Sequence, residues 1–375
     1  MSALFWAVFD EKQKAKAEEI LATFDKDSKD EMGLMSITMA LSSLMFPGTS
    51  VLHTRLRYVF LVGWIFLEAL KHKSVTLELL HKKEKELRKI LQNEKKNCTD
   101  SNLYLGILGV TKIIDLDGEG ENLSQPPFSI YFNLLKEWNI IRDKSISVNE
   151  TYREVFCSEY LEILENKFDI STFILTKQEK SYISKVIPDS ILSTIFEKNI
   201  YLPDEVFLDF DVAKIGDQAK EEIFIKSQNL SLLMWGVMLY YNYYLSGENS
   251  ELEENFIIWK QGIKEMMKSD WIPQMTLNLV TSVVNISQEL FIDNWFKYIK
   301  KYGKDITLEN APKIDGKSLK YFLMDREKTL KGDRSRLLKK QNGEVFNDAR
   351  FGINPPSYRW SNIIKFKKDY DYVAN

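Results

Sequence analysis

Three histidines and two cysteines are the whole supply of the strongest metal-binding side chains in this chain of 375 residues. His53, His72 and His81 lie far from Cys98 and Cys157, and no CxxC pair is present, so the sequence predicts no tetrahedral zinc site. It also contains no GxxxxGK[ST] or GxGxxG phosphate loop and no GxSxG nucleophile elbow. We therefore predict no catalytic residues, no cofactor and no metal. A divergent enzyme whose carboxylates meet only in the fold is left open.

Two short segments imitate known sites in part. The HxK pattern that starts at His81 resembles that of phospholipase-D-type nucleases, but Arg88 stands where the aspartate of that motif should follow. The acidic residues 115–121 imitate the first half of a calcium loop, but Pro126 occupies the position of the bidentate glutamate. We interpret the first segment as part of a charged helix and the second as an acidic, solvated loop.

Basic side chains are the stronger candidates for binding. Arg55 and Arg57 follow the turn FPGTS near the expected start of a helix, where they either clamp a phosphate or carboxylate or form internal salt bridges. Arg359 and Trp360 either stack on nucleic-acid bases or anchor the C-terminal segment in the core. A third group, suited to phosphate or partner binding or to a solvated loop, consists of Lys331, Arg334, Arg336, Lys339 and Lys340.

Positive charge is concentrated towards the C-terminus. The whole chain has a formal net charge of −3. Residues 297–368 nevertheless contain about 19 lysines and arginines against about 8 acidic residues. Such an asymmetry favours an electrostatic face for an acidic partner or for nucleic acid, although a solvated, lysine-rich surface has the same composition.

The composition favours helices. With 44% hydrophobic residues the chain can bury a sizeable core, and its 16 glycines and 9 prolines are few for its length. Apolar stripes with caps predict helices over residues 10–24, 30–45, 50–70, 76–94, 102–110, 129–140, 149–167, 176–187, 230–245, 251–267, 275–301 and 318–328. The predicted fold class is mainly α: a multi-helix assembly with little β structure and a basic, less regular C-terminal segment.

The domain prediction places a helical body at residues 1–302, with candidate sub-boundaries near 115–127 and 203–217. A basic segment, residues 303–375, packs on that body. The uncharged residues 228–245 are too short and too rich in tyrosine for a membrane span, which needs about 20 apolar residues, so we expect a buried helix. Because no export signal and no disulfide framework are recognisable, we expect a cytoplasmic protein without membrane contact.

Several ordered blocks give the chain a family resemblance. They are FPGTSVLHTRLRY at residues 46–58, LGILG and PPFSIYFNLLKEWNI within 105–140, LTKQEKSYI at 175–183, LLMWGVMLYYNYYL at 232–245, and GDRSRLL with YRW at 332–338 and 358–360. The chain resembles an uncharacterised bacterial family catalogued as domain of unknown function 6361. The acidic residues 115–121 depart from the shorter, basic loop expected there.

The resemblance implies a context without a mechanism, since members of that family look like accessory genes beside helicases and nucleases in anti-phage defence clusters. The first hypothesis is therefore a non-catalytic subunit that scaffolds or regulates a helicase/ATPase or nuclease partner. The alternative is a direct nucleic-acid-binding module. In both, we expect residues 303–375 to be the main binding surface, with Tyr358 and Trp360 as anchors and Lys331, Arg334, Arg336 and Lys339 pointing outward.

Overall fold

The structure is a computed structural model. It describes residues 30–72, 75–98, 101–112, 120–142, 155–166, 168–202, 206–246, 250–314, 316–346 and 354–372. The chain divides into two compact units, each formed by segments that are distant in sequence. Unit 1 comprises Met1–Glu18, Met45–Asp204 and Arg359–Asn375, and unit 2 comprises Glu19–Leu44 and Glu205–Tyr358.

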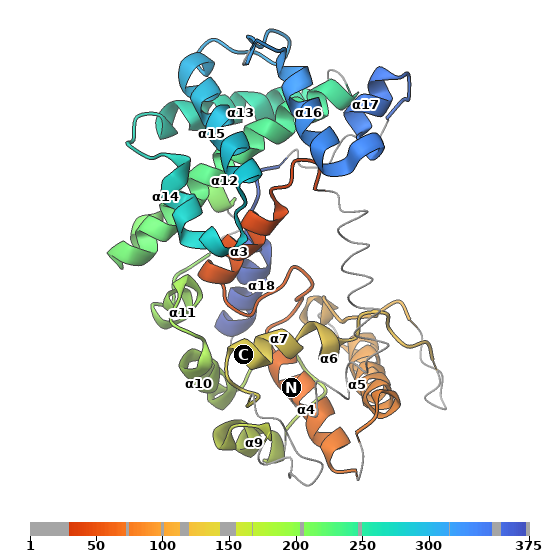
Figure 1. Cartoon of the computed structure of the whole chain (residues 1–375). Helices are drawn as coiled ribbons and strands as arrows, with labels where there is room; N and C mark the ends of the chain where they lie inside the picture. Colours follow the sequence, from red (N-terminus) through yellow and green to blue (C-terminus); the bar gives the residue numbers. More distant parts are fainter. Residues whose placement is uncertain are drawn as a thin grey trace. The chain divides into compact units, whose positions relative to one another are not determined.

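Unit 1 contains most of the first half of the chain and its last helix (Figure 1). Its α-helices are α4 (Tyr58–Leu70), α5 (Leu77–Asn97), α6 (Pro127–Ile130), α7 (Phe132–Glu137), α9 (Ser158–Glu165), α10 (Lys177–Val186), α11 (Ile191–Glu197) and α18 (Trp360–Asp371), with the 3₁₀ helix η1 (Ser101–Tyr104). The core of this unit is α4, which is buried over most of its length because nearly all its side chains are apolar. α5 packs against α4, and α18 packs against α11.

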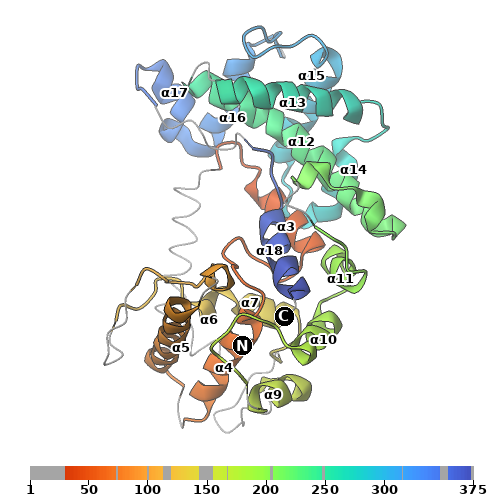
Figure 2. The same ribbon diagram turned by 180° about the vertical axis from the view of Figure 1, so that it is seen from behind.

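Unit 2 is arranged around one long helix, α12 (Gln218–Ser246). Its other elements are α3 (Met35–Met45, up to Leu44), α13 (Ser250–Met266), α14 (Pro273–Leu277), α15 (Ile286–Tyr302), α16 (Leu319–Lys331), α17 (Arg336–Gln341) and the 3₁₀ helices η2 (Phe207–Asp209), η3 (Val212–Lys214), η4 (Asn278–Val283) and η5 (Gly332–Arg334). α12 contacts α13, α14, α15, α16 and α17. Figure 2 shows α12 and α13 side by side, as does the opposite view.

The mainly α fold class is confirmed. In the part of the chain that the structure describes, β pairing is confined to two isolated bridges, Ile141 with Phe156 and Ile314 with Lys317. The expected buried helix at residues 228–245 is the C-terminal part of α12. None of the helices among the described residues has the length and apolar character needed to cross a bilayer.

The units divide the chain elsewhere than the predicted boundary at residues 302 and 303. Residues 303–358 belong to unit 2, and residues 359–375 belong to unit 1. This basic segment also contains more regular structure than expected, namely α16, η5, α17 and α18. The predicted helix at residues 10–24 lies outside the described residues.

Two predicted helices were wrong at points that matter for the site. Ser50 does not begin a helix, because the chain remains irregular until α4 starts at Tyr58. Residues 102–110 form only the short η1, since Gly106 and Gly109 have φ angles of +85° and +71°, which a right-handed helix cannot contain. A Cβ on Gly106 would also lie 3.2 Å from the side chains of Thr54 and Arg55.

The packing of α12 on α13 depends on a glycine. A Cβ on Gly236 would lie 2.3 Å from the ring of Trp259, whose Nε1 donates to the carbonyl oxygen of Leu232 at 2.9 Å. A Cβ on Gly262, in the same helix pair, would approach only the flexible end of Leu232, at 2.9 Å.

These two glycines form a matched test. We expect Gly236→Ala to lower the free energy of unfolding by about 3 kcal/mol, because a buried, hydrogen-bonded indole must move. Gly262→Ala should change it by less than about 1 kcal/mol, since better helix propensity offsets a small adjustment of Leu232. Chemical denaturation of both variants measures the difference, and equal effects would contradict this packing.

Candidate functional site

The candidate site begins with the irregular segment Thr49–Arg57, which two aromatic side chains hold in place. The hydroxyl of Tyr131 accepts hydrogen bonds from the backbone N–H groups of Thr54 and Arg55, at 2.9 and 3.1 Å, and donates to the carbonyl oxygen of Arg55 at 2.8 Å. The His53 ring stacks on Tyr131 with centroids 4.2 Å apart. Burial lowers the pKa of His53 to about 4, so the ring is neutral at physiological pH.

One face of the C-terminal helix closes over this segment. Asn362, Phe366 and Asp369 recur at spacings of four and three residues, so they share a face of α18, and Arg359 is the residue that precedes the helix. The guanidinium of Arg359 donates to the carbonyl oxygen of Thr49, and the Asn362 amide donates to that of His53 at 2.6 Å. The Phe366 ring lies parallel to His53, with centroids 5.8 Å apart. Asp369 completes the series by contacting Arg55 and Leu56.

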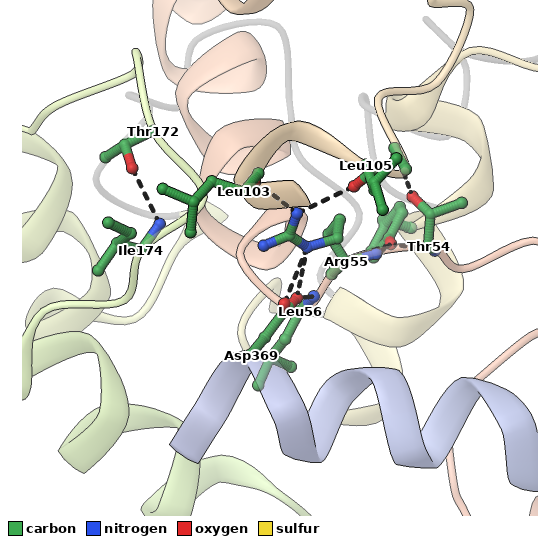
Figure 3. A network of polar contacts seen from close by, with 10 residues as sticks. Thr54, Arg55, Leu56, Leu103, Leu105, Thr172, Ile174 and Asp369 are labelled. Atoms are coloured by element: carbon green, nitrogen blue, oxygen red, sulfur yellow. Dashed lines mark hydrogen bonds and ion pairs between the residues drawn. The ribbon is translucent and has the colours of Figure 1, made fainter. Parts of the chain in front are cut away.

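Arg55 is fixed on three sides (Figure 3). Its Nε donates to both oxygens of Asp369, at 2.8 and 3.0 Å, and its Nη1 donates to the carbonyl oxygens of Leu103 and Leu105, at 2.7 and 2.9 Å. The guanidinium carbon lies 4.6 Å from the centroid of the Phe173 ring. Among the described residues, no hydrogen bond is made by Nη2.

Asp369 is a buried carboxylate with several donors. Besides Arg55 it accepts the backbone N–H of Leu56 at 2.7 Å. Burial raises the pKa of Asp369 above its ordinary value, and the charge of Arg55 and these hydrogen bonds oppose that rise. The donors therefore counteract the effect of burial and hold the carboxyl group of Asp369 against Arg55.

Beside Arg55 lies a pocket of about 510 Å³ in unit 1. This volume is in the range of about 300–1,000 Å³ that is usual for small-ligand sites. Its apolar wall consists of Leu103, Leu105, Phe173 and Ile174. Its polar lining includes Arg55, Asp369, Lys365 and Lys368.

Two lysines from one turn of α18 lie at the pocket. Lys365 and Lys368 are both exposed, and Lys365 makes no hydrogen bond or ion pair within the described part of the chain. Because Asp369 offsets the charge of Arg55, these lysines give the pocket a net positive charge. Apolar walls with a few convergent cationic groups are the chemistry of a site that binds an anion with an attached apolar part.

Arg57, the second arginine of the segment, is enclosed in an internal ion pair, which was one of the two predicted alternatives. Its Nη2 lies 3.0 Å from Glu179 Oε1, and both side chains are 1% exposed. Glu179 is also part of the capping box that starts α10, where it accepts the N–H of Thr176. Arg57 therefore joins α4 to α10, and we do not count it in the site.

The basic cluster around Gly332 is only partly directed outward, contrary to our expectation for Lys331 and Arg336. The Nζ of Lys331 lies 3.3 Å from Oε1 of Glu31, a carboxylate that is only 3% exposed, and Arg336 lies 3.9 Å from the same atom. The Lys340 ammonium donates to the carbonyl oxygen of Leu245. Arg334 is exposed and Lys339 half-buried.

Trp360 and Tyr358 are buried, as expected of anchors. Trp360 contacts Phe46 in unit 1, with ring centroids 6.0 Å apart, and Tyr358 contacts Phe207 in unit 2, with centroids 5.0 Å apart. Arg359 is mostly buried, and burial lowers the pKa of its guanidinium below the ordinary value. Trp360 therefore presents no surface for base stacking, and the guanidinium of Arg359 donates to the backbone of the segment described above.

Sequence reasoning found Arg55 but missed Asp369, Lys365, Lys368 and the apolar wall. A signal for Asp369 exists, because it is an acidic residue within a basic stretch and repeats the spacing of Arg359, Asn362 and Phe366. The wall had no signal in the sequence, because its members come from η1, from the residue that follows η1 and from the segment before α10.

A second group of buried ionisable residues lies on α5. His81 is inside this helix, as expected, and Arg88 Nε lies 3.2 Å from Glu84 Oε1 with both side chains at most 2% exposed. Arg88 also donates to the carbonyl oxygen of Glu121 at 3.0 Å. Burial raises the pKa of Glu84 to about 7, although Arg88 and Lys85 oppose this. No group of three or more His, Cys, Asp or Glu among the described residues is arranged to hold a metal ion.

Comparison with known proteins gives one match. The model of a family described as "Family of unknown function (DUF6361)" matches residues 1–92, which include Arg55, Arg57 and α4 but none of α18. The resemblance to this family is thus confirmed for that part of the chain. Neither the curated proteins nor the solved structures contain a match.

The buried Glu84 predicts a pH dependence of stability. Because its pKa is raised from 4.5 to about 7 in the folded protein, the folded state holds this proton more tightly, and stability should fall as pH rises through that window. We expect this contribution to reach roughly 3 kcal/mol between pH 5 and pH 8. Denaturation of the wild type and of Glu84→Gln across this range isolates it, and parallel curves would contradict the burial of this carboxyl group.

The Glu31 ion pair predicts a cost for charge reversal. Burial raises the pKa of Glu31, while Lys331 and Arg336 oppose that rise. Lys331→Glu would bring a second carboxylate to Glu31, so we expect a loss of about 3 kcal/mol in the free energy of unfolding. Lys339→Glu, a reversal nearby with no carboxylate partner among the described residues, is the matched control. Thermal and chemical denaturation should show a clear loss for Lys331→Glu alone.

Proposed function

We propose that this chain is a non-catalytic subunit of a bacterial defence complex, and that unit 1 recognises an acidic group of a partner in the Arg55 pocket. The single observation that carries the recognition step is the arrangement of Arg55. Asp369, two carbonyl oxygens and the Phe173 ring fix its guanidinium, while Nη2 makes no hydrogen bond within the described residues.

A fixed guanidinium favours binding because little conformational freedom remains to be lost when a ligand arrives. The exposed lysines of α18 add long-range attraction for an anion. The defence context, and a helicase or nuclease as the partner, come from the family resemblance alone.

The alternative function, direct binding of nucleic acid by the basic residues 303–375, is weaker on these contacts. Lys331 and Arg336 contact a buried glutamate, and Lys340 contacts a backbone carbonyl group. Side chains used in this way contribute less to a phosphate-binding surface than outward-pointing ones.

Co-purification tests the proposal. The tagged chain is expressed from its native operon as the wild type, as a Lys365→Glu/Lys368→Glu variant and as a Lys82→Glu control, which reverses an exposed lysine of unit 1 outside the pocket. We expect the wild type and the control to retain products of neighbouring genes, and the pocket variant to lose them while its circular dichroism spectrum shows that it remains folded. The proposal would be overturned if all three proteins were recovered without products of neighbouring genes. It would also be overturned if the pocket variant retained those products.

A further inference from the structure

We infer that the Arg55 pocket takes a carboxylate joined to a short aliphatic group, the chemistry of a protein C-terminus that ends in leucine, isoleucine or valine and of a free branched-chain acid. This inference rests on the proposed function and narrows it from any acidic group to one class of ligand.

The donors of Arg55 favour a carboxylate over a phosphate. Nε and Nη1 are both used internally, so the guanidinium offers Nη2 rather than a complete two-pronged edge. The Asp369 carboxylate, which also lines the pocket, occupies the Nε side of the guanidinium. A small acid that needs one hydrogen bond from the arginine therefore fits these groups best.

The walls favour an aliphatic group over a nucleobase. Leu103, Leu105 and Ile174 are aliphatic, and Leu105 is 56% exposed, so it offers apolar surface that a ligand can cover. Phe173 is only 2% exposed, with the Arg55 guanidinium over its ring and the Tyr58 ring in edge-type contact with it, at 5.2 Å between centroids. It has no open face on which a base could stack.

The size of the pocket admits more than the terminal group. A volume of about 510 Å³ exceeds what a single short acid fills, so the pocket has room for backbone atoms that precede a terminal residue. The exposed Lys365 and Lys368 are placed to attract the terminal carboxylate before it reaches Arg55.

Calorimetric titration of the full chain tests this inference with four small probes. N-acetyl-leucine supplies both features, N-acetyl-leucinamide removes the carboxylate, N-acetylglycine removes the aliphatic group, and adenosine monophosphate supplies a phosphate and a base. We expect N-acetyl-leucine to bind at least roughly tenfold more tightly than each of the others. Tighter binding of adenosine monophosphate, or equal binding of the amide, would overturn the inference.

Two further probes distinguish the sources of this chemistry. Tighter binding of N-acetyl-alanyl-alanyl-leucine than of N-acetyl-leucine identifies a protein C-terminus, and tighter binding of 4-methylpentanoate identifies a free acid. Both outcomes support an aliphatic carboxylate, whereas binding of neither probe would count against it.

Variants place the ligand in the pocket. Lys365→Glu and Leu105→Ser change exposed side chains, so folding should persist while affinity for N-acetyl-leucine falls roughly tenfold in each. Lys82→Glu should bind as the wild type does. Equal binding by all variants would place the ligand elsewhere and overturn the inference.

The two proposals can fail separately. If co-purification depends on Lys365 and Lys368 but no aliphatic carboxylate binds, the proposed function stands and the ligand class is wrong. If N-acetyl-leucine binds at the pocket but the pocket variant still retains its partners, the ligand class stands and the partner-recognition role is wrong.

Discussion

The ion pair of Arg55 with Asp369 is the contact on which the candidate site depends. It joins residues 314 positions apart and brings the last turn of α18 onto the segment that precedes α4. Bringing these two distant residues together carries an entropic cost of loop closure. The ion pair offsets that cost together with the neighbouring contacts of Arg359, Asn362 and Phe366. The pocket beside Arg55 therefore requires the C-terminal helix to be folded onto unit 1.

A largely buried ion pair is a costly way to stabilise a fold, because both charges must be removed from water. Its advantage here is geometric. Asp369 receives Nε of Arg55 and the backbone N–H of Leu56 at once, so it fixes the guanidinium relative to the backbone that carries it. Arg55 thus stabilises the fold through Nε and Nη1, and it can bind a ligand through Nη2.

Much of the fold could be predicted from the sequence, because helix signals are local. Thr176 and Glu179 form the capping box that begins α10, and Thr76 caps α5, both near the predicted starts. The errors at residues 50–57 and 102–110 have a tertiary cause. Tyr131 and His53 hold the first segment out of a helix, and glycines with positive φ end the second.

The candidate site could be predicted only in part. Arg55 was recognisable as an arginine after a turn, but its partner lies in the last turn of a helix that the sequence pattern did not reveal. Composition likewise could not separate Arg55 from Arg57, since only burial against Glu179 assigns Arg57 to the core. The same limitation applied to Lys331 and Arg336, whose partner Glu31 is distant in sequence.

The most direct test of the central claim is an NMR titration that observes the Nε–H groups of arginine in protein labelled with ¹⁵N-arginine. Arg57 is the internal control, because its Nε also donates to a carboxylate, Glu179, at 3.1 Å, but away from the pocket. We predict that Arg55 gives a slowly exchanging Nε–H signal that Asp369→Asn weakens, and that N-acetyl-leucine shifts this signal while the Arg57 signal stays in place. An Arg55 Nε–H that exchanges as rapidly as that of a free arginine, or that does not respond to the ligand, would contradict the claim that Asp369 holds Arg55 in position for binding.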